Sequence, residues 1–156
     1  MYKKIMVAVD GSTSSKQALD EALKLAKGSD AQIVAVYVVD QSALFTYAGR
    51  VDPHTLLEEL RRDGAAVLHD VEQIIASAAV SGETELIGTD DIGEDIAERL
   101  QRYVGENAID LAVVGTHGRR GIRRMVIGSV AERFVRGSNC PVLLVRSEDV
   151  PAAAAA

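Results

Sequence analysis

The sequence has little of what marks a disulfide-stabilised or membrane-embedded protein. Its 156 residues include one cysteine, Cys140, so an internal disulfide bond is excluded. No apolar run approaches the roughly 20 residues that a helix needs to cross a bilayer. The opening stretch MYKKIMVAVD is too short and too soon polar for a secretory signal peptide. We therefore expect a cytoplasmic protein that does not insert into membranes.

Histidines, aromatic residues and positive charge are also scarce. The three histidines and the single cysteine show no metal-ligand spacing, which disfavours a zinc site built by the protein. The formal net charge is -6, and aromatic residues make up 4% of the chain. An acidic chain without aromatics interleaved among basic residues is not expected to bind nucleic acid.

What the chain does contain is an alternation of apolar runs and amphipathic stretches. Runs such as Ile5–Val9 are apolar on both faces, as in a parallel sheet covered by helices on each side. We predict strands at 5–9, 33–39, 83–89, 110–114 and 141–145, and four helices at 12–27, 53 to about 80, 92–104 and 130–137. This order predicts an α/β protein with a single-domain, doubly wound, five-stranded parallel sheet. The domain should cover residues 1–147, and 148–156 should form a disordered tail.

One stretch of unusual composition, GTHGRRGIRRMVIGS, lies between the fourth predicted strand and the fourth predicted helix. Glycines let backbone N–H groups approach an anion closely, and a helix amino terminus adds unpaired donors. The glycines could instead make an ordinary turn, with Ser129 capping the helix. In a doubly wound sheet, ligands bind beyond the carboxyl ends of strands. The loops that start at Asp10 and Gly115 are therefore the first places to expect a site.

The pattern Gly115-x-x-Gly118, nine residues, then Gly128-Ser129 resembles the ATP-binding signature of the universal stress protein family. Further segments resemble that family in the same order: KKIMVAVDGS, YVVD, LAVVGTHG, GSVAERFV and CPVLLVR. The resemblance covers about residues 2–146. It implies a Rossmann-like fold of the adenine-nucleotide α-hydrolase type, with strand order 3-2-1-4-5.

The resemblance also implies an adenine-nucleotide site. The end of the first strand would lie against the nucleotide, the main chain of Val38 would bind the adenine edge, and the glycine motif would hold the phosphates. The implied cofactor is ATP, or AMP or ADP, with Mg²⁺ or Mn²⁺ held mainly by the phosphates. The implied site residues are Ala8, Val9, Asp10, Val38, Val114, Gly115, Gly118, Gly128, Ser129 and Val130.

Several residues near this motif have two readings. Asp10 could simply form a turn before Gly11, and His117 could contact a phosphate or be an exposed loop residue. The four loop arginines could neutralise phosphate, contact RNA or be solvated; they are Arg119, Arg120, Arg123 and Arg124. Residues 40–52, with Phe45 and Tyr47, could cover the base or the sheet.

The last predicted strand, 141–145, is apolar and should end one side of the sheet. Pairing with the same strand of a second subunit would cover it, so we expect a homodimer, as the resemblance also implies.

No general base or nucleophile is evident near the glycine motif, so ATP hydrolysis should be slow or absent. The leading hypothesis is a nucleotide-dependent regulator of the stress response, with an unidentified protein partner. The alternatives are an ATP-cleaving enzyme, or an interaction module for a transporter or regulator that binds nucleotide only structurally.

Overall fold

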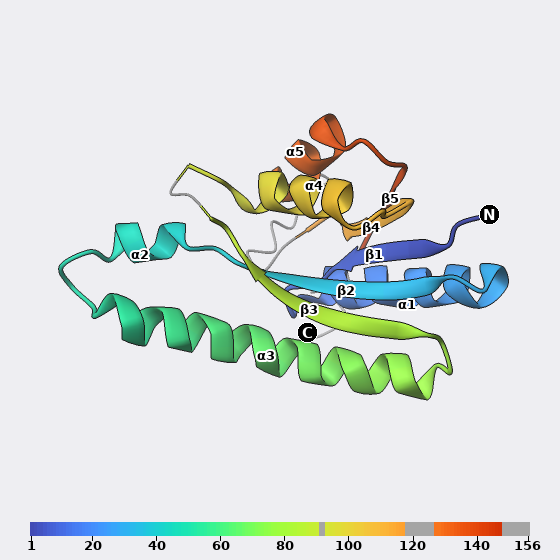
Figure 1. Ribbon diagram of the computed structural model, residues 1–156, viewed down its shortest axis with the longest axis horizontal. Helices are drawn as coiled ribbons and strands as arrows, with labels where there is room; N and C mark the ends of the chain where they lie inside the picture. Colours follow the sequence, from blue (N-terminus) through green and yellow to red (C-terminus); the bar gives the residue numbers. More distant parts are fainter. Residues whose placement is uncertain (91–92, 118–126, 148–156) are drawn as a thin grey trace, which may run out of the picture.

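The computed structural model describes residues 1–90, 93–117 and 127–147, in which five strands alternate with helices (Figure 1). The strands are β1 (Lys4–Ala8), β2 (Gln32–Val39), β3 (Gly82–Gly88), β4 (Leu111–Gly115) and β5 (Val142–Val145). The helices in these ranges are α1 (Thr13–Ser29), α2 (Ser42–Thr46), α3 (Pro53–Ser77), α4 (Ile96–Glu106) and α5 (Ser129–Gly137). Each predicted strand and helix is present within a few residues of its expected bounds.

The five strands form one parallel sheet in the order β3-β2-β1-β4-β5, as predicted. Helices α1 and α3 cover one face of this sheet, and α4 and α5 cover the other (Figure 1). The chain adds strands outward from β1 to β3, then returns to add β4 and β5 on the other side of β1. The strand order therefore reverses between β1 and β4.

The central strands are buried because helices cover both of their faces. Ile5, Met6 and Val7 of β1 are all fully inaccessible to solvent. Ile5 and Val7 pack in the cluster under α1 and α3, whereas Met6 packs in the cluster under α4 and α5. Alternation of side chains along the strand explains why a continuous apolar run was needed here.

The prediction of four helices was wrong by one, because it missed α2. This five-residue helix has no buried residue and no side-chain cap at its start. It follows a turn in which the Asp40 carboxylate accepts the Ser42 N–H at 3.0 Å, and the Gln41 N–H donates to Thr89 Oγ1 at 3.0 Å. A helix this short carries no periodic pattern that sequence reasoning can detect.

Helix α4 begins later than the predicted residue 92. Asp95 caps it, accepting the Glu98 N–H at 2.8 Å, while the Glu98 carboxylate accepts the Asp95 N–H at 3.1 Å. This reciprocal arrangement satisfies donors that would otherwise be unpaired at the helix start. The sequence pattern Asp95-x-x-Glu98 is typical of such a helix start.

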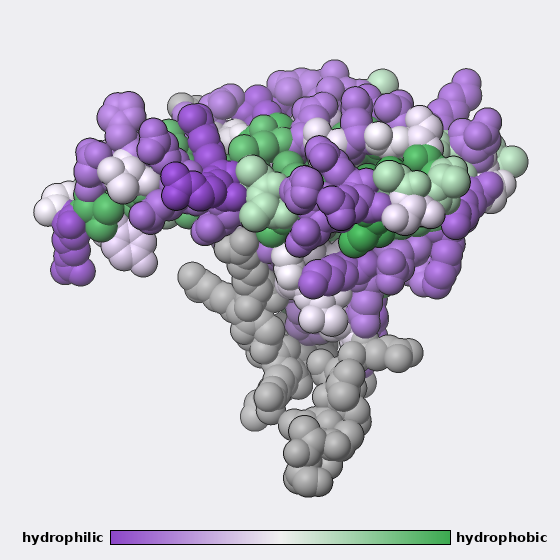
Figure 2. Space-filling model, turned by 90° about the horizontal axis from the view of Figure 1, so that it is seen from below, coloured by the Kyte–Doolittle hydropathy of each residue, from purple (hydrophilic) through white to green (hydrophobic). Residues whose placement is uncertain are grey.

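The long helix α3 lies unusually close to the sheet at Gly64. A Cβ placed on Gly64 would lie 2.6 Å from Leu86 Cδ1 and 2.7 Å from Tyr37 Cδ1. The outer side of α3 faces solvent, and the surface on that side of the molecule is mainly hydrophilic with scattered hydrophobic residues (Figure 2). A glycine in the middle of this helix is thus a packing requirement and not a helix breaker.

We expect Gly64→Ala to lower the free energy of unfolding by about 1–3 kcal/mol, because the methyl group overpacks the contact with Tyr37 and Leu86. Gly105→Ala is the matched control, since no atom lies within 4 Å of its added Cβ. That variant should gain up to about 1 kcal/mol from helix propensity. Urea unfolding of both variants measures the difference, and equal effects of the same sign would contradict the packing argument.

Candidate functional site

The carboxyl ends of β1, β2 and β4 lie at the same edge of the sheet. The predicted site residues there pack on the sheet face that α4 and α5 cover. Val114 is buried at the end of β4, while Ala8 and Val38 are half-buried at the ends of β1 and β2. All three side chains pack in or against the same hydrophobic cluster. The structure therefore brings these three predicted site residues together as an apolar patch at the strand-order reversal.

The backbone of Val38 extends beyond the end of β1. Near that end, the Val9 N–H donates to the Val36 carbonyl oxygen at 2.9 Å. In a parallel strand, the backbone groups of alternate residues face the same neighbour. Like Val36, Val38 therefore points its N–H and carbonyl groups toward the β1 side of β2. Val38 lies beyond the last residue of β1, so these groups do not pair with that strand.

A hydrogen bond joins the end of β4 to the start of α5. The Gly128 N–H donates to the Thr116 carbonyl oxygen at 2.6 Å, and the Thr116 N–H donates to the Val145 carbonyl oxygen at 3.0 Å. Thr116, 8% exposed, is thus tied both to α5 and to the neighbouring strand β5. As a result, the amino terminus of α5 lies beside the carboxyl end of β4.

The first turn of α5 has the donors that an anion requires. Its N-cap residue, Gly128, has no side chain to cap the helix, and Ser129 and Val130 are exposed. Glu132 in the first turn forms an ion pair with Arg136 at 2.8 Å, which offsets its negative charge. Helix-start N–H groups that no side chain in the described ranges caps, together with a positive dipole end, favour an anionic ligand at this position.

Asp10 is held in the turn between β1 and α1. Its carboxylate accepts the Ser12 N–H at 2.8 Å, and its own N–H donates to Ser15 Oγ at 3.3 Å. Asp10 therefore forms a turn at the end of β1, and its predicted contact with a nucleotide stays a prediction. The turn also fixes the carboxylate at the end of β1, next to Val9.

Ser14 is a site-edge residue that the sequence reasoning missed. Its hydroxyl oxygen accepts the His117 N–H at 3.2 Å, although 103 positions separate the two residues. His117 itself is half-buried, with Nδ1 3.0 Å from Thr116 Oγ1 and 3.3 Å from Ser147 Oγ. No local pattern in the sequence indicates a contact between α1 and the end of β4.

The remaining predicted loop positions lie outside the described residues. They are Gly118, Arg119, Arg120, Arg123 and Arg124. The predicted tail, 148–156, lies outside them as well. Phe45 and Tyr47, in and after α2, are 66% and 47% exposed, so they do not cover the sheet.

Two concave regions are lined by residues that belong neither to the apolar patch nor to α5. One is a depression of about 600 Å³ lined by the acidic residues Asp90, Glu94 and Glu98, together with Arg102. The other, of about 120 Å³, lies between α1 and α3 and includes Val9.

Within the described ranges no group of three or more His, Cys, Asp or Glu residues could hold a metal ion. In the same part of the chain, every helix is too short or too polar to cross a lipid bilayer.

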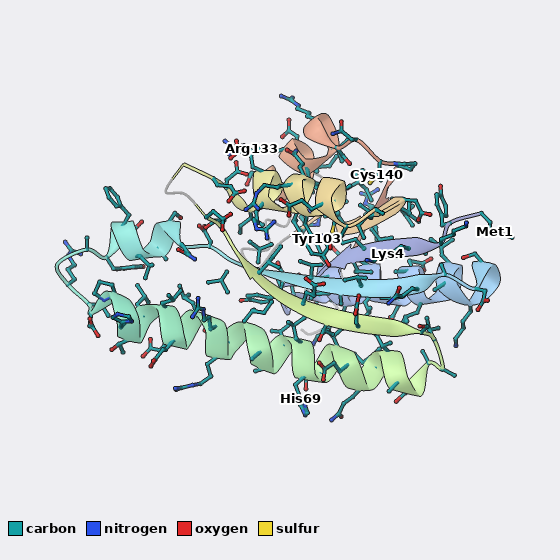
Figure 3. All side chains as sticks on the ribbon, in the orientation of Figure 1. Met1, Lys4, His69, Tyr103, Arg133 and Cys140 are labelled. Atoms are coloured by element: carbon teal, nitrogen blue, oxygen red, sulfur yellow. The ribbon has the colours of Figure 1, made fainter. Side chains whose placement is uncertain are left out.

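The charged residues before and in α4 form ion pairs with one another. The Arg102 guanidinium bonds Glu94 at 2.9 Å and Asp90 at 2.7 Å. The bond to Arg102 holds the pKa of the Glu94 carboxyl below its usual range, and the acceptors in turn raise the pKa of Arg102. Tyr103, on the side of α4 that faces the sheet (Figure 3), has a raised pKa because it is buried and, secondly, because Glu85 lies near. The acidic depression is thus an intramolecular ion network, poorly suited to a polyanion.

We expect Glu94→Gln to lower the free energy of unfolding by about 0.5–1.5 kcal/mol at pH 7, because a charge-assisted bond to Arg102 is lost. A carboxyl whose pKa is depressed in the folded state stabilises the fold above its unfolded pKa, near 4.5. That contribution disappears as the pH falls through the folded-state pKa, so wild type and variant should converge below pH 4.5.

Glu106→Gln is the control, because its carboxylate is 54% exposed and lies 3.3 Å from the same Arg102. Its effect should stay within about 0.5 kcal/mol at every pH. Chemical unfolding between pH 3 and 8 measures both variants. A Glu94→Gln deficit that is independent of pH would contradict this account.

An open parallel sheet with strand order 3-2-1-4-5 and helices on both faces defines a doubly wound α/β protein, the class in which ligands bind where the strand order reverses. The chain matches the model of the universal stress protein family over residues 1–146. It is 33% identical to the universal stress protein YxiE of Bacillus subtilis over 153 residues, covering 94% of this chain and 100% of YxiE. The chain belongs to the universal stress protein family.

Solved structures agree with this assignment. A universal stress protein family member from Burkholderia pseudomallei is 38% identical, with a TM-score of 0.77, over 94% of this chain and 97% of that one. A universal stress protein from Archaeoglobus fulgidus in complex with dAMP is 23% identical, with a TM-score of 0.68, over 92% and 98%. An Arabidopsis thaliana family member with AMP bound is 20% identical, with a TM-score of 0.67, over 94% and 93%. The last two show likeness of fold.

Proposed function

We propose that this protein binds ATP at the carboxyl ends of β1, β2 and β4, and that occupancy of the site regulates a protein partner in the stress response. The observation that carries the proposal is the amino terminus of α5, which no described side chain caps and which the bond between Gly128 and Thr116 holds beside the end of β4. AMP or ADP would use the same base and ribose positions. The protein would act in the cytoplasm.

The apolar patch and the helix terminus match the two halves of an adenine nucleotide. Ala8, Val9 and Asp10 would lie against the nucleotide, with the Asp10 region near the ribose. The main chain of Val38 would bond the adenine edge, and Val114 and Gly115 would flank the base and sugar. The phosphates would be received by Gly118 and by the start of α5 at Gly128, whose own N–H is taken by Thr116. The donors there would be the N–H and hydroxyl groups of Ser129 and the N–H of Val130. Mg²⁺ or Mn²⁺ would accompany the triphosphate and be held mainly by its oxygens. The complexes of fold relatives with dAMP and AMP support an adenine nucleotide as the ligand.

A regulator is favoured over an efficient ATPase. Among the described residues around the α5 terminus, the nearest carboxylate in the helix, Glu132, is engaged by Arg136. Asp10 is engaged by the turn at the start of α1. Neither is arranged as a general base for an attacking water, so hydrolysis would be slow. Measuring partner affinity with and without ATP separates a nucleotide-dependent regulator from an interaction module whose nucleotide is structural.

We expect mass spectrometry of the purified native protein to detect released adenine nucleotide, and Gly128→Val to weaken ATP binding by more than about tenfold. The valine side chain would occupy the space from which the α5 donors approach the phosphates. Gly128 has φ -58° and ψ 153°, which valine also adopts, so the fold should survive.

Isothermal titration with ATP makes the comparison, with Gly105→Ala as a remote glycine control that should bind like wild type. Gly118→Val tests the other end of the motif. Full ATP affinity in both valine variants would remove the basis for assigning phosphates to this region.

We further propose that the protein is a homodimer joined through β5. This strand pairs with β4 on one side only, and all four of its residues are half-buried. Val135 on the adjoining helix α5 is 42% exposed. Antiparallel pairing with a second β5 would satisfy the edge backbone groups and bury these side chains.

We expect Leu144→Lys to raise the dimer dissociation constant at least about tenfold, because two symmetry-related ammonium groups would face each other across the strand pair. Leu86→Lys, on the opposite edge strand, should leave the dimer intact. Light scattering at micromolar concentration reads the mass directly. A monomeric wild-type protein would contradict the proposal.

A further inference from the structure

The peptide unit between Thr116 and His117 is held at both of its ends. Its carbonyl oxygen accepts the Gly128 N–H at 2.6 Å, and its N–H donates to Ser14 Oγ at 3.2 Å. A trans peptide is planar, with its N–H and carbonyl pointing in opposite directions. Fixing the direction of the N–H therefore fixes the direction of the carbonyl that receives Gly128.

Ser14 itself has little freedom to move. It is 3% exposed and lies in the first turn of α1, whose N-cap, Ser12, accepts the Ser15 N–H at 3.1 Å. A Cβ on Gly115 would lie 2.8 Å from the Ser14 carbonyl carbon and oxygen, so the end of β4 packs directly against this turn. The Ser14 hydroxyl thus presents a rigid acceptor to the His117 N–H.

We propose that Ser14 is a positioning residue for the anion site: through the Thr116–His117 peptide it sets the direction in which the first turn of α5 points its donors. The inference rests on the proposed function for its ligand, the phosphates of an adenine nucleotide. It adds a residue of α1 that touches no part of that ligand. Removing the acceptor takes away the bond from the His117 N–H to Ser14 Oγ, and with it one of the constraints on the peptide plane.

The experiment compares Ser14→Ala with Ser29→Ala, a serine in the same helix whose hydroxyl donates to the Leu25 carbonyl oxygen at 2.8 Å. In the nucleotide-free protein, the Gly128 amide proton of Ser14→Ala should shift upfield and exchange faster, although the substitution is remote from Gly128 in sequence. Ser29→Ala should leave that resonance unchanged. Ser14→Cys, which keeps a weaker acceptor, should give an intermediate shift.

Ligand binding supplies the second measurement. ATP affinity should fall about three- to tenfold in Ser14→Ala, whereas adenosine, which lacks phosphates, should bind as it does to wild type. An equal loss for both ligands would overturn the proposal in favour of a general structural defect. So would an unchanged Gly128 amide, or an unchanged ATP affinity in a variant whose Gly128 amide has shifted. If wild type binds no ATP, the proposed function fails, while the amide measurement still decides whether Ser14 orients α5.

Discussion

The hydrogen bond from the Gly128 N–H to the Thr116 carbonyl is the constraint on which the carboxyl edge of the sheet depends. It joins two points that twelve positions separate, so α5 starts beside β4 whatever path the intervening chain takes. The strand supplies an apolar floor and the helix supplies polar donors. An apolar surface next to polar donors suits a ligand that has both an apolar part and an anionic part. Neither element has both properties alone, so this combination depends on the two lying side by side.

The architecture was largely readable from the sequence because parallel sheets impose a strong pattern. Strands covered on both faces must be apolar throughout, and runs such as Ile33–Val39 meet that demand without ambiguity. The family resemblance added the strand order, which the pattern alone does not specify. The candidate site came from the same resemblance. The structure places Ala8, Val38 and Val114 in or against one hydrophobic cluster, and their contacts with a nucleotide stay predictions.

Features that depend on contacts distant in sequence were not readable. Ser14 stands in a run of serine and threonine residues, STSS, where nothing distinguishes it from its neighbours until α1 packs on β4. Helix α2 follows a turn held by the Asp40 carboxylate and by Thr89, the residue after β3, and so leaves no periodic pattern in the sequence. The start of α4 is a different case, since the pattern Asp95-x-x-Glu98 is a capping signal within the sequence itself.

The close approach at Gly64 has a consequence for how this sequence can change over time. Three positions from separate elements, Gly64 of α3, Tyr37 of β2 and Leu86 of β3, share one tightly filled space. A larger residue at position 64 becomes tolerable only after position 37 or 86 has become smaller, or α3 has moved outward. Substitutions at positions 64, 37 and 86 should therefore be correlated among descendants of this chain. Glycine at position 64 should be kept wherever positions 37 and 86 keep large side chains.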